Sequence, residues 1–181
     1  MLLITIPETE QYDEVKDEFV VSKAQVLHLE HSLVSLSKWE SVWTKPFLTK
    51  DDKTLAESID YIRCMTITQN VFPETYNLVT REILSEVSAY IEAPMTATTF
   101  SKNERNSAIQ REVITAEIIY YWMVALAIPF ECQRWHLNRL LTLINVCNIK
   151  NQPVKKTGRK ETLSRNRALN AARRQQYNTT G

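Results

Sequence analysis

Glycine is almost absent from this chain, with only Gly158 and Gly181 among 181 residues. Loops that cradle phosphate groups need closely spaced glycines, because glycine alone takes positive φ angles freely and lets the backbone approach a ligand closely. The sequence therefore excludes the common glycine-rich nucleotide-binding motifs.

Long hydrophobic runs are also missing. The most apolar stretch, residues 118–130, holds thirteen uncharged residues after Glu117, which falls short of the roughly 20 needed to cross a bilayer. The N-terminus turns acidic within eight residues and lacks the basic start of a secretory signal. We expect a buried core helix in place of a membrane span, and no contact with a membrane.

Cysteine is scarce, and the three present do not form an obvious pair. Cys64, Cys132 and Cys147 are an odd number, each among apolar residues, which favours buried thiols in a reducing compartment. Cys132 and His136 are four residues apart and would share a helix face, but no third group orients them for nucleophilic chemistry. Cys147 lies about three helical turns from His136, too far to join a metal site on one straight helix.

Two further histidines, His28 and His31, also lack a nearby ligand in the sequence. Neither paired carboxylates at a motif spacing nor a nucleophile elbow occurs. The sequence therefore predicts a protein that is not an enzyme and that needs no cofactor or metal.

Charge is divided unevenly along the chain. Residues 150–181 carry nine Lys and Arg and one acid, a net +8, whereas residues 1–149 carry thirteen bases and twenty acids, a net −7. A basic block of this kind is typical of an interaction segment. Its partner could be nucleic acid, an acidic protein or the acidic face of this protein.

The first half of the chain predicts a strand pair followed by helices. Residues 2–6 and 24–30 are rich in β-favouring types and predict a hairpin. The acidic connection, residues 7–18, predicts a solvated, flexible loop before 19–21 resumes extended structure. Leu33, Leu36, Trp39 and Trp43 then recur at helical spacing up to Pro46. Their stripe is either buried against other helices or, through Trp39 and Trp43, a peptide-binding face.

Residues 51–92 predict further helices. Thr49 is expected to cap a helix over 51–65, with Leu55 among the inward residues, and Thr80 to cap a helix through Glu92. A short turn is expected to start at Pro73. Residues 95–107 are polar without a period and predict a long surface loop, which is either a contact region or a tolerant insertion.

The densest apolar content lies in residues 110–148, and we expect the rest of the chain to pack on it. Pro129 should divide it into two helices. The first is apolar on most faces, so it should be surrounded by partners, with Glu117 paired to Arg134 or Arg139. The second should turn Phe130, Leu137, Leu140, Leu141, Ile144 and Cys147 inward. Whether Trp122 or Trp135 faces a partner groove stays open.

The basic end of the chain predicts a helix over residues 160–176 with only a thin apolar side, which would gain order on a partner. Its arginines could contact phosphates, but aromatic interleaving is limited to Tyr177, so nucleic-acid binding is the lesser alternative. The fold class is thus mainly α: a compact helical domain, 1–149, with a small N-terminal β-hairpin, and a basic helical tail, 150–181. Candidate partner-binding residues are Trp39, Trp43, Trp135, Lys155, Lys156, Arg159, Arg165, Arg167, Arg173 and Arg174.

Several strings taken together resemble a family of proteins from long-tailed bacteriophages and prophages, the tail assembly chaperones. The resemblance extends over nearly the whole chain, and none of its strings has a catalytic meaning. The strings are EHSLVSLSKWE (30–40), DYIRCMT (60–66), PMTATTF (94–100), IIYYWM (118–123), WHLNRLLTLINVCNIKNQP (135–153) and LSRNRALNAARR (163–174).

This resemblance implies a non-enzymatic, mostly helical protein of the host bacterial cytoplasm during phage assembly. It would bind the tape measure protein in a groove and promote assembly of tail tube protein around it. The basic end would contact tube subunits or a frameshifted longer form of the chain, or support self-association. The alternative is a structural protein retained in the virion tail, neck or baseplate.

Overall fold

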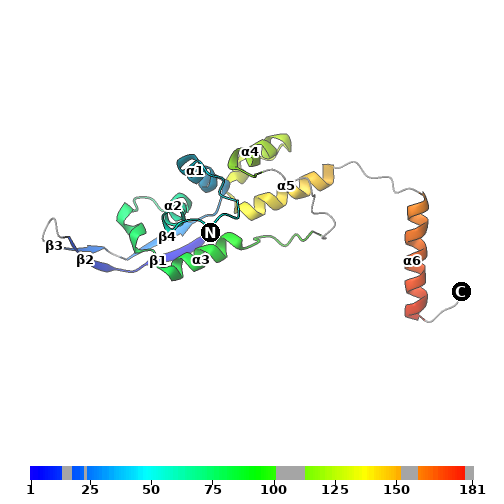
Figure 1. Cartoon of the computed structure of the whole chain (residues 1–181), viewed down its shortest axis with the longest axis horizontal. Helices are drawn as coiled ribbons and strands as arrows, with labels where there is room; N and C mark the ends of the chain where they lie inside the picture. Colours follow the sequence, from blue (N-terminus) through cyan, green and yellow to red (C-terminus); the bar gives the residue numbers. More distant parts are fainter. Residues whose placement is uncertain (14–17, 23, 101–112, 152–158, 178–181) are drawn as a thin grey trace. The chain divides into compact units, whose positions relative to one another are not determined.

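An antiparallel strand pair opens the structure, a computed structural model that describes residues 1–13, 18–22, 24–100, 113–151 and 159–177 (Figure 1). Strand β1 (Leu2–Ile6) pairs with β4 (Gln25–Leu29), with Leu3 opposite His28 and Thr5 opposite Val26. Side chains alternate across a strand, so Ile4, Ile6, Leu27 and Leu29 are buried while Leu3 and Val26 are exposed. The predicted strand pair is confirmed.

A second strand pair corrects part of the flexible loop predicted for residues 7–18, of which 14–17 lie outside the described residues. Strand β2 (Thr9–Asp13) pairs with β3 (Glu18–Ser22), with Tyr12 opposite Phe19 and Gln11 opposite Val20. The many acids of this segment indicated exposure to solvent, which is compatible with a strand. The β-favouring residues of β3 supply a pairing partner that the acid content alone did not reveal.

The next two helices begin at side-chain caps. Helix α1 (Leu33–Trp43) begins after Ser32, which forms a capping box with Ser35. Helix α2 (Leu55–Met65) begins after Thr54 in a capping box with Glu57. The predicted start at residue 51 under Thr49 is therefore wrong, because the Thr54–Glu57 box fixes the first turn later. Leu55, predicted inward, is exposed at that first turn.

Two predicted elements follow as expected. The 3₁₀ helix η1 (Pro73–Leu78) starts at its proline, and helix α3 (Arg81–Glu92) begins after Thr80, whose hydroxyl accepts the Ile83 amide. Residues 95–100, at the start of the predicted long loop, are in neither helix nor strand; 101–112 lie outside the described residues.

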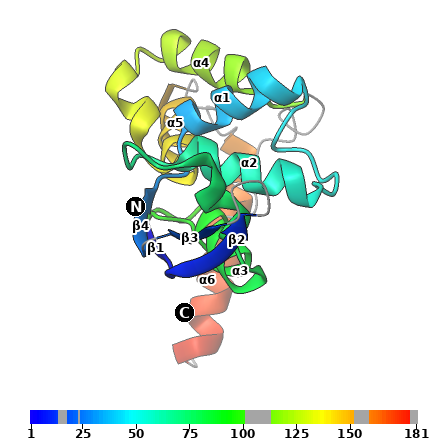
Figure 2. The ribbon, with the colours of Figure 1, turned by 90° about the vertical axis from the view of Figure 1, so that its left-hand side faces the viewer.

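The chain break at Pro129 is confirmed. Helix α4 (Ala116–Ala125) precedes it, and the 3₁₀ helix η4 (Phe130–Arg134) and helix α5 (Leu137–Asn151) follow. Figure 2 shows α4 beside α1, with which it is in contact. On α5, Leu137, Leu140 and Ile144 are buried.

The core draws on both the first 65 residues and the stretch 110–148. Of the 22 buried apolar residues in the described part of the chain, eleven lie in residues 1–65 and eight in residues 116–144, so 110–148 is one of two main contributors to the core. Three of the eight, Ala116, Ile119 and Met123, come from α4. Helix α4 is therefore packed along one face, and its other face is left at the surface.

The chain divides into two compact units, Met1–Lys150 and Asn151–Gly181. The second contains helix α6 (Arg159–Tyr177), close to the helix predicted over 160–176. The described structure confirms a mainly α protein with an N-terminal antiparallel strand pair. Among the described helices, none combines the length and apolar character that a membrane span requires.

Candidate partner-binding surface

Large apolar side chains are exposed on the side of α4 that faces away from its packed residues. Tyr121 and Val124 are 68% and 63% exposed, and Phe130 just after the helix is 55% exposed. Tyr121 and Val124 are three residues apart and so are neighbours on one helix face. The Phe130 ring lies 6.4 Å from that of Tyr120. We call Tyr121, Val124 and Phe130 the α4 outer surface.

This surface corrects the prediction that α4 is surrounded by partners. Ala116, Ile119 and Met123 are buried, whereas Val113, Tyr121 and Val124 are not. Nine of the ten α4 residues are apolar, so composition gave no sign of which face packs. Phe130, predicted inward, is also exposed.

The packed face of α4 is fixed by the buried carboxylate of Glu40 on α1. Its Oε2 accepts the Ala116 amide at 2.7 Å and its Oε1 accepts the Phe47 amide at 2.8 Å. Ala116 is the first residue of α4, so the acid also lies at the positive end of that helix. Glu40 is only 8% exposed. This one side chain joins α1, the segment after it and the start of α4.

Sequence reasoning did not single out Glu40 for this role. A signal was present, because Glu40 follows Leu36 by four residues and adjoins Trp39 on the buried stripe of α1. A charged side chain on such a stripe must find hydrogen-bond donors. The identity of those donors, Phe47 and Ala116, depends on the tertiary structure.

The C-terminal end of α4 is closed by a left-handed residue. Ala127 has φ 52°; the Ile128 amide donates to Met123 O at 2.8 Å and the Ala127 amide to Val124 O at 3.1 Å. This is a Schellman motif with alanine where glycine is favoured. It stops the helix ahead of Pro129, so Phe130 follows the outer surface directly.

The acid in the first turn of α4 does not form the predicted ion pair. Glu117 is exposed, so solvent satisfies its charge without a buried partner. No ion pair joins it to Arg134 or Arg139, all three of which are described. The guanidinium of Arg139 instead lies over the Trp135 ring at 4.2 Å.

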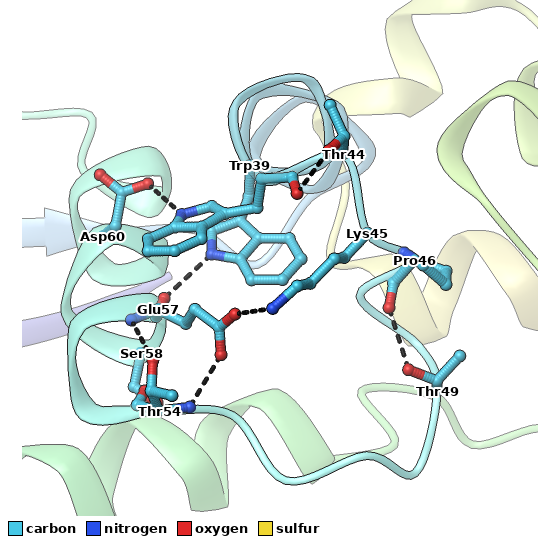
Figure 3. A network of polar contacts seen from close by, with 10 residues as sticks. Trp39, Thr44, Lys45, Pro46, Thr49, Thr54, Glu57, Ser58 and Asp60 are labelled. Atoms are coloured by element: carbon cyan, nitrogen blue, oxygen red, sulfur yellow. Dashed lines mark hydrogen bonds and ion pairs between the residues drawn. The ribbon is translucent and has the colours of Figure 1, made fainter.

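The candidate tryptophans belong mainly to the packed interior. Trp39 is 1% exposed and donates its indole N–H to Glu57 O at 2.9 Å (Figure 3). Trp43 is half-buried, donates to Asp60 Oδ2 at 2.9 Å and stacks on Trp39. Trp39 therefore does not belong to a binding face, and burial of the α1 stripe is the better interpretation. Trp135 is half-buried beneath Arg139.

A polar network lies beside Trp39. The Glu57 carboxylate accepts from Lys45 Nζ at 2.7 Å and from the Thr54 amide at 2.8 Å, as Figure 3 shows. These two hydrogen bonds lower the pKa of Glu57. The neighbouring cavity has a volume of about 190 Å³, below the roughly 300–1,000 Å³ typical of sites for drug-sized ligands. The network caps α2 and holds the segment between α1 and α2.

Two buried histidines link the strand pair to α2, α3 and α5. The His31 ring lies 5.1 Å from that of His136, and His31 Nδ1 is hydrogen-bonded to the Tyr61 hydroxyl at 2.5 Å. His136 Nε2 donates to Tyr90 O at 3.0 Å, and its Nδ1 accepts the Asn138 amide at 3.3 Å. Both nitrogens of His136 are thus used in structural contacts.

Burial lowers the pKa of both rings. The pKa of His31 falls to about 3, first because burial disfavours the charged ring and then because His136 is adjacent. The pKa of His136 is also lowered by burial. Among the described residues, no group of three or more His, Cys, Asp or Glu side chains is placed to hold a metal ion.

The structure describes the side chains of only some of the basic candidate residues. Arg167, Arg173 and Arg174 are exposed on α6. Arg159 and Arg165 are within the same helix, but their side chains are outside the described part. Lys155 and Lys156 lie outside the described residues altogether. Five of the seven basic candidates thus lie in helix α6, and the side chains of three of them are described as exposed.

Comparisons of the chain with protein-family models, with curated proteins and with solved structures find no match.

Proposed function

We propose that the chain is a non-enzymatic tail assembly chaperone of a long-tailed phage and that it binds the tape measure protein. The α4 outer surface is the observation that carries this proposal. Tyr121 and Val124 are exposed on a helix that is anchored from its other side, and Phe130, the first residue of η4, is exposed after it. Such a surface suits the apolar face of an amphipathic helix, and tape measure proteins are long and rich in such helices in the family that the sequence resembles.

The polar groups of the interior support a binding role over catalysis. Glu40 and His136 form their hydrogen bonds with backbone groups that begin or join elements, and Glu57 accepts from the Thr54 amide and from Lys45 Nζ. Catalytic acids and bases, in contrast, need an open position beside a reacting atom. The chaperone would act in the host bacterial cytoplasm.

Co-expression tests the proposal directly. The chain and the tape measure protein encoded by the same phage are expressed together, and the soluble fraction of the tape measure protein is compared with its expression alone. The chaperone proposal expects most of the tape measure protein to become soluble and to co-purify with the chain. A tape measure protein that stays insoluble, with no chain attached, contradicts the proposal.

A structural protein of the virion tail is the second candidate, because the strand pair offers another apolar surface. Leu3 and Val26 are exposed on the outer face of β1 and β4, and Ile67, whose amide donates to His28 O at 2.8 Å, is exposed beside them. Such a face could pack between subunits. Mass spectrometry of purified virions separates the two candidates, since stoichiometric amounts of the chain favour the virion protein and its absence favours the chaperone.

A further inference from the structure

The three arginines of helix α6 whose side chains are described, Arg167, Arg173 and Arg174, share one face. Positions three and four apart are neighbours on a helix, and this spacing relates Leu163, Arg167, Asn170, Arg174 and Tyr177, each of them exposed. Asn166 and Arg173 flank the same line. The other described side chains of residues 163–177 are uncharged: Ser164, Ala168, Leu169, Ala171, Ala172, Gln175 and Gln176. We call Leu163, Asn166, Arg167, Asn170, Arg173, Arg174 and Tyr177 the α6 basic face.

The residue types on this face fit phosphate better than carboxylate-rich protein. All three described cations of the face, Arg167, Arg173 and Arg174, are arginines, whose planar guanidinium binds phosphate in a bidentate way. Protein interfaces need an apolar core, yet Leu163 and Tyr177, the apolar and aromatic residues of this face, are about 21 Å apart along the axis. Asn166 and Asn170 lie between them, and amide side chains can pair with base edges.

The charge distribution confines this contact to the tail. Residues 150–181 have a net charge of +8, whereas residues 1–149 have a net charge of −7 and would be repelled by a polyanion. Helix α6 has 19 residues, which corresponds to about 28 Å. A helix of this kind fits the major groove of duplex DNA, and arginine-rich helices also bind structured RNA.

We infer that the α6 basic face binds the phosphate backbone of a double-stranded nucleic acid through Arg167, Arg173 and Arg174. From the sequence alone, nucleic-acid binding was the lesser alternative, because Tyr177 is the only aromatic residue of the tail. The helix favours nucleic-acid binding, because it places Tyr177 on the same side as the arginines and asparagines. This role is separate from tape measure binding by the α4 outer surface.

Fluorescence anisotropy with the full chain tests the inference. Labelled duplex DNA of about 25 base pairs and a labelled RNA hairpin are titrated at about 50 and 200 mM salt. Binding to either probe should weaken steeply with salt, and the tighter probe names the nucleic acid. Replacing Arg167, Arg173 and Arg174 with alanine should weaken binding at least tenfold and reduce the slope of log K against log salt by about three.

The matched control removes three positive charges from the first unit, Met1–Lys150. Lys38, Arg81 and Arg134 are exposed there, and their replacement with alanine should leave both affinity and salt slope unchanged. Three results would overturn the inference: no binding at about 50 mM salt, equal weakening by the control variant, or equal competition by polyglutamate. The last of these results would indicate an acidic protein as the partner.

Discussion

Helices α1 and α4 are similar in length and lie against each other, but they use their apolar residues differently. Helix α1 has six apolar residues of eleven and buries Leu33, Leu36 and Trp39. Helix α4 has nine of ten, yet Tyr121 and Val124 are exposed. The more apolar helix is thus the less completely buried one. When a helix has more apolar residues than its packed face contains, the exposed ones indicate a surface for a partner.

The largest expected difference between the two helices is in stability. Leu36→Ala should cost about 2–5 kcal/mol, because it opens a cavity in the core. Tyr121→Ala should change the free energy of unfolding by no more than about 0.5 kcal/mol, because the ring is exposed. Urea unfolding followed by circular dichroism measures both. Equal losses would show that the α4 outer surface is packed within the chain.

The two acids associated with α4 should also differ. Glu40→Ala leaves the Phe47 and Ala116 amides without their acceptor and should cost about 2–4 kcal/mol. Glu117→Ala is the matched control; it removes an exposed acid from the first turn and should cost at most about 1 kcal/mol. Thermal and urea unfolding distinguish the two variants. A Glu40→Ala protein as stable as the parent would rule out the carboxylate as the anchor of α4.

Acid should destabilise the core that α1 helps to form. The pKa of His31 is about 3 in the folded protein and about 6.5 in an unfolded chain. Between pH 6.5 and 3 the unfolded state therefore binds a proton at His31, whereas the folded state does not. Stability should fall as pH is lowered from 6.5 toward 3, by about 2 kcal/mol between pH 6.5 and 5 for this one group.

Urea unfolding at stepped pH measures this loss. His31→Phe should flatten the dependence, although it also removes the hydrogen bond to Tyr61 and lowers stability at neutral pH. His28→Gln is the control, because His28 is exposed and its replacement should preserve the dependence. Wild-type stability that stays level from pH 6.5 to 5 would show that His31 is protonated in the folded protein.

The smallest expected effects concern the end of α4. Ala127→Gly should stabilise the protein by about 0.5–1 kcal/mol, because Ala127 has a positive φ that glycine adopts freely. Ala125→Gly, within the same helix, should destabilise it by a similar amount. Melting temperatures should shift in opposite directions, by about 2–4 °C. Shifts in the same direction would contradict the left-handed cap.

The sequence predicted elements better than it predicted faces. The strand pair, α1, α3, α6 and the break at Pro129 follow from periodicity, caps and proline, which act locally. The start of α2 was misplaced because Asp51 and Asp52 resemble a first turn, whereas the reciprocal Thr54–Glu57 box fixes it. Strand β2 was missed because pairing with β3 depends on residues further along the chain.

In the candidate site, too, the sequence predicted the helix but not which of its faces is exposed. A helix that is apolar on nearly every side has no internal signal for which side packs, so Tyr121, Val124 and Phe130 were expected inside. Their exposure depends on where Glu40 holds the first residue of α4. Trp39, in contrast, has a clear periodic signal, and burial was one of the two interpretations that this signal predicted.

Binding of a tape measure fragment to paired surface variants tests whether the α4 outer surface binds the tape measure protein. Calorimetric titration compares the parent with Tyr121→Ser/Val124→Ser and with Leu55→Ser/Phe72→Ser, a control pair of exposed apolar residues outside α4. We expect at least a tenfold loss of affinity for the first pair, with unchanged unfolding, and no loss for the second. Unchanged affinity of the first pair would contradict the assignment of the α4 outer surface.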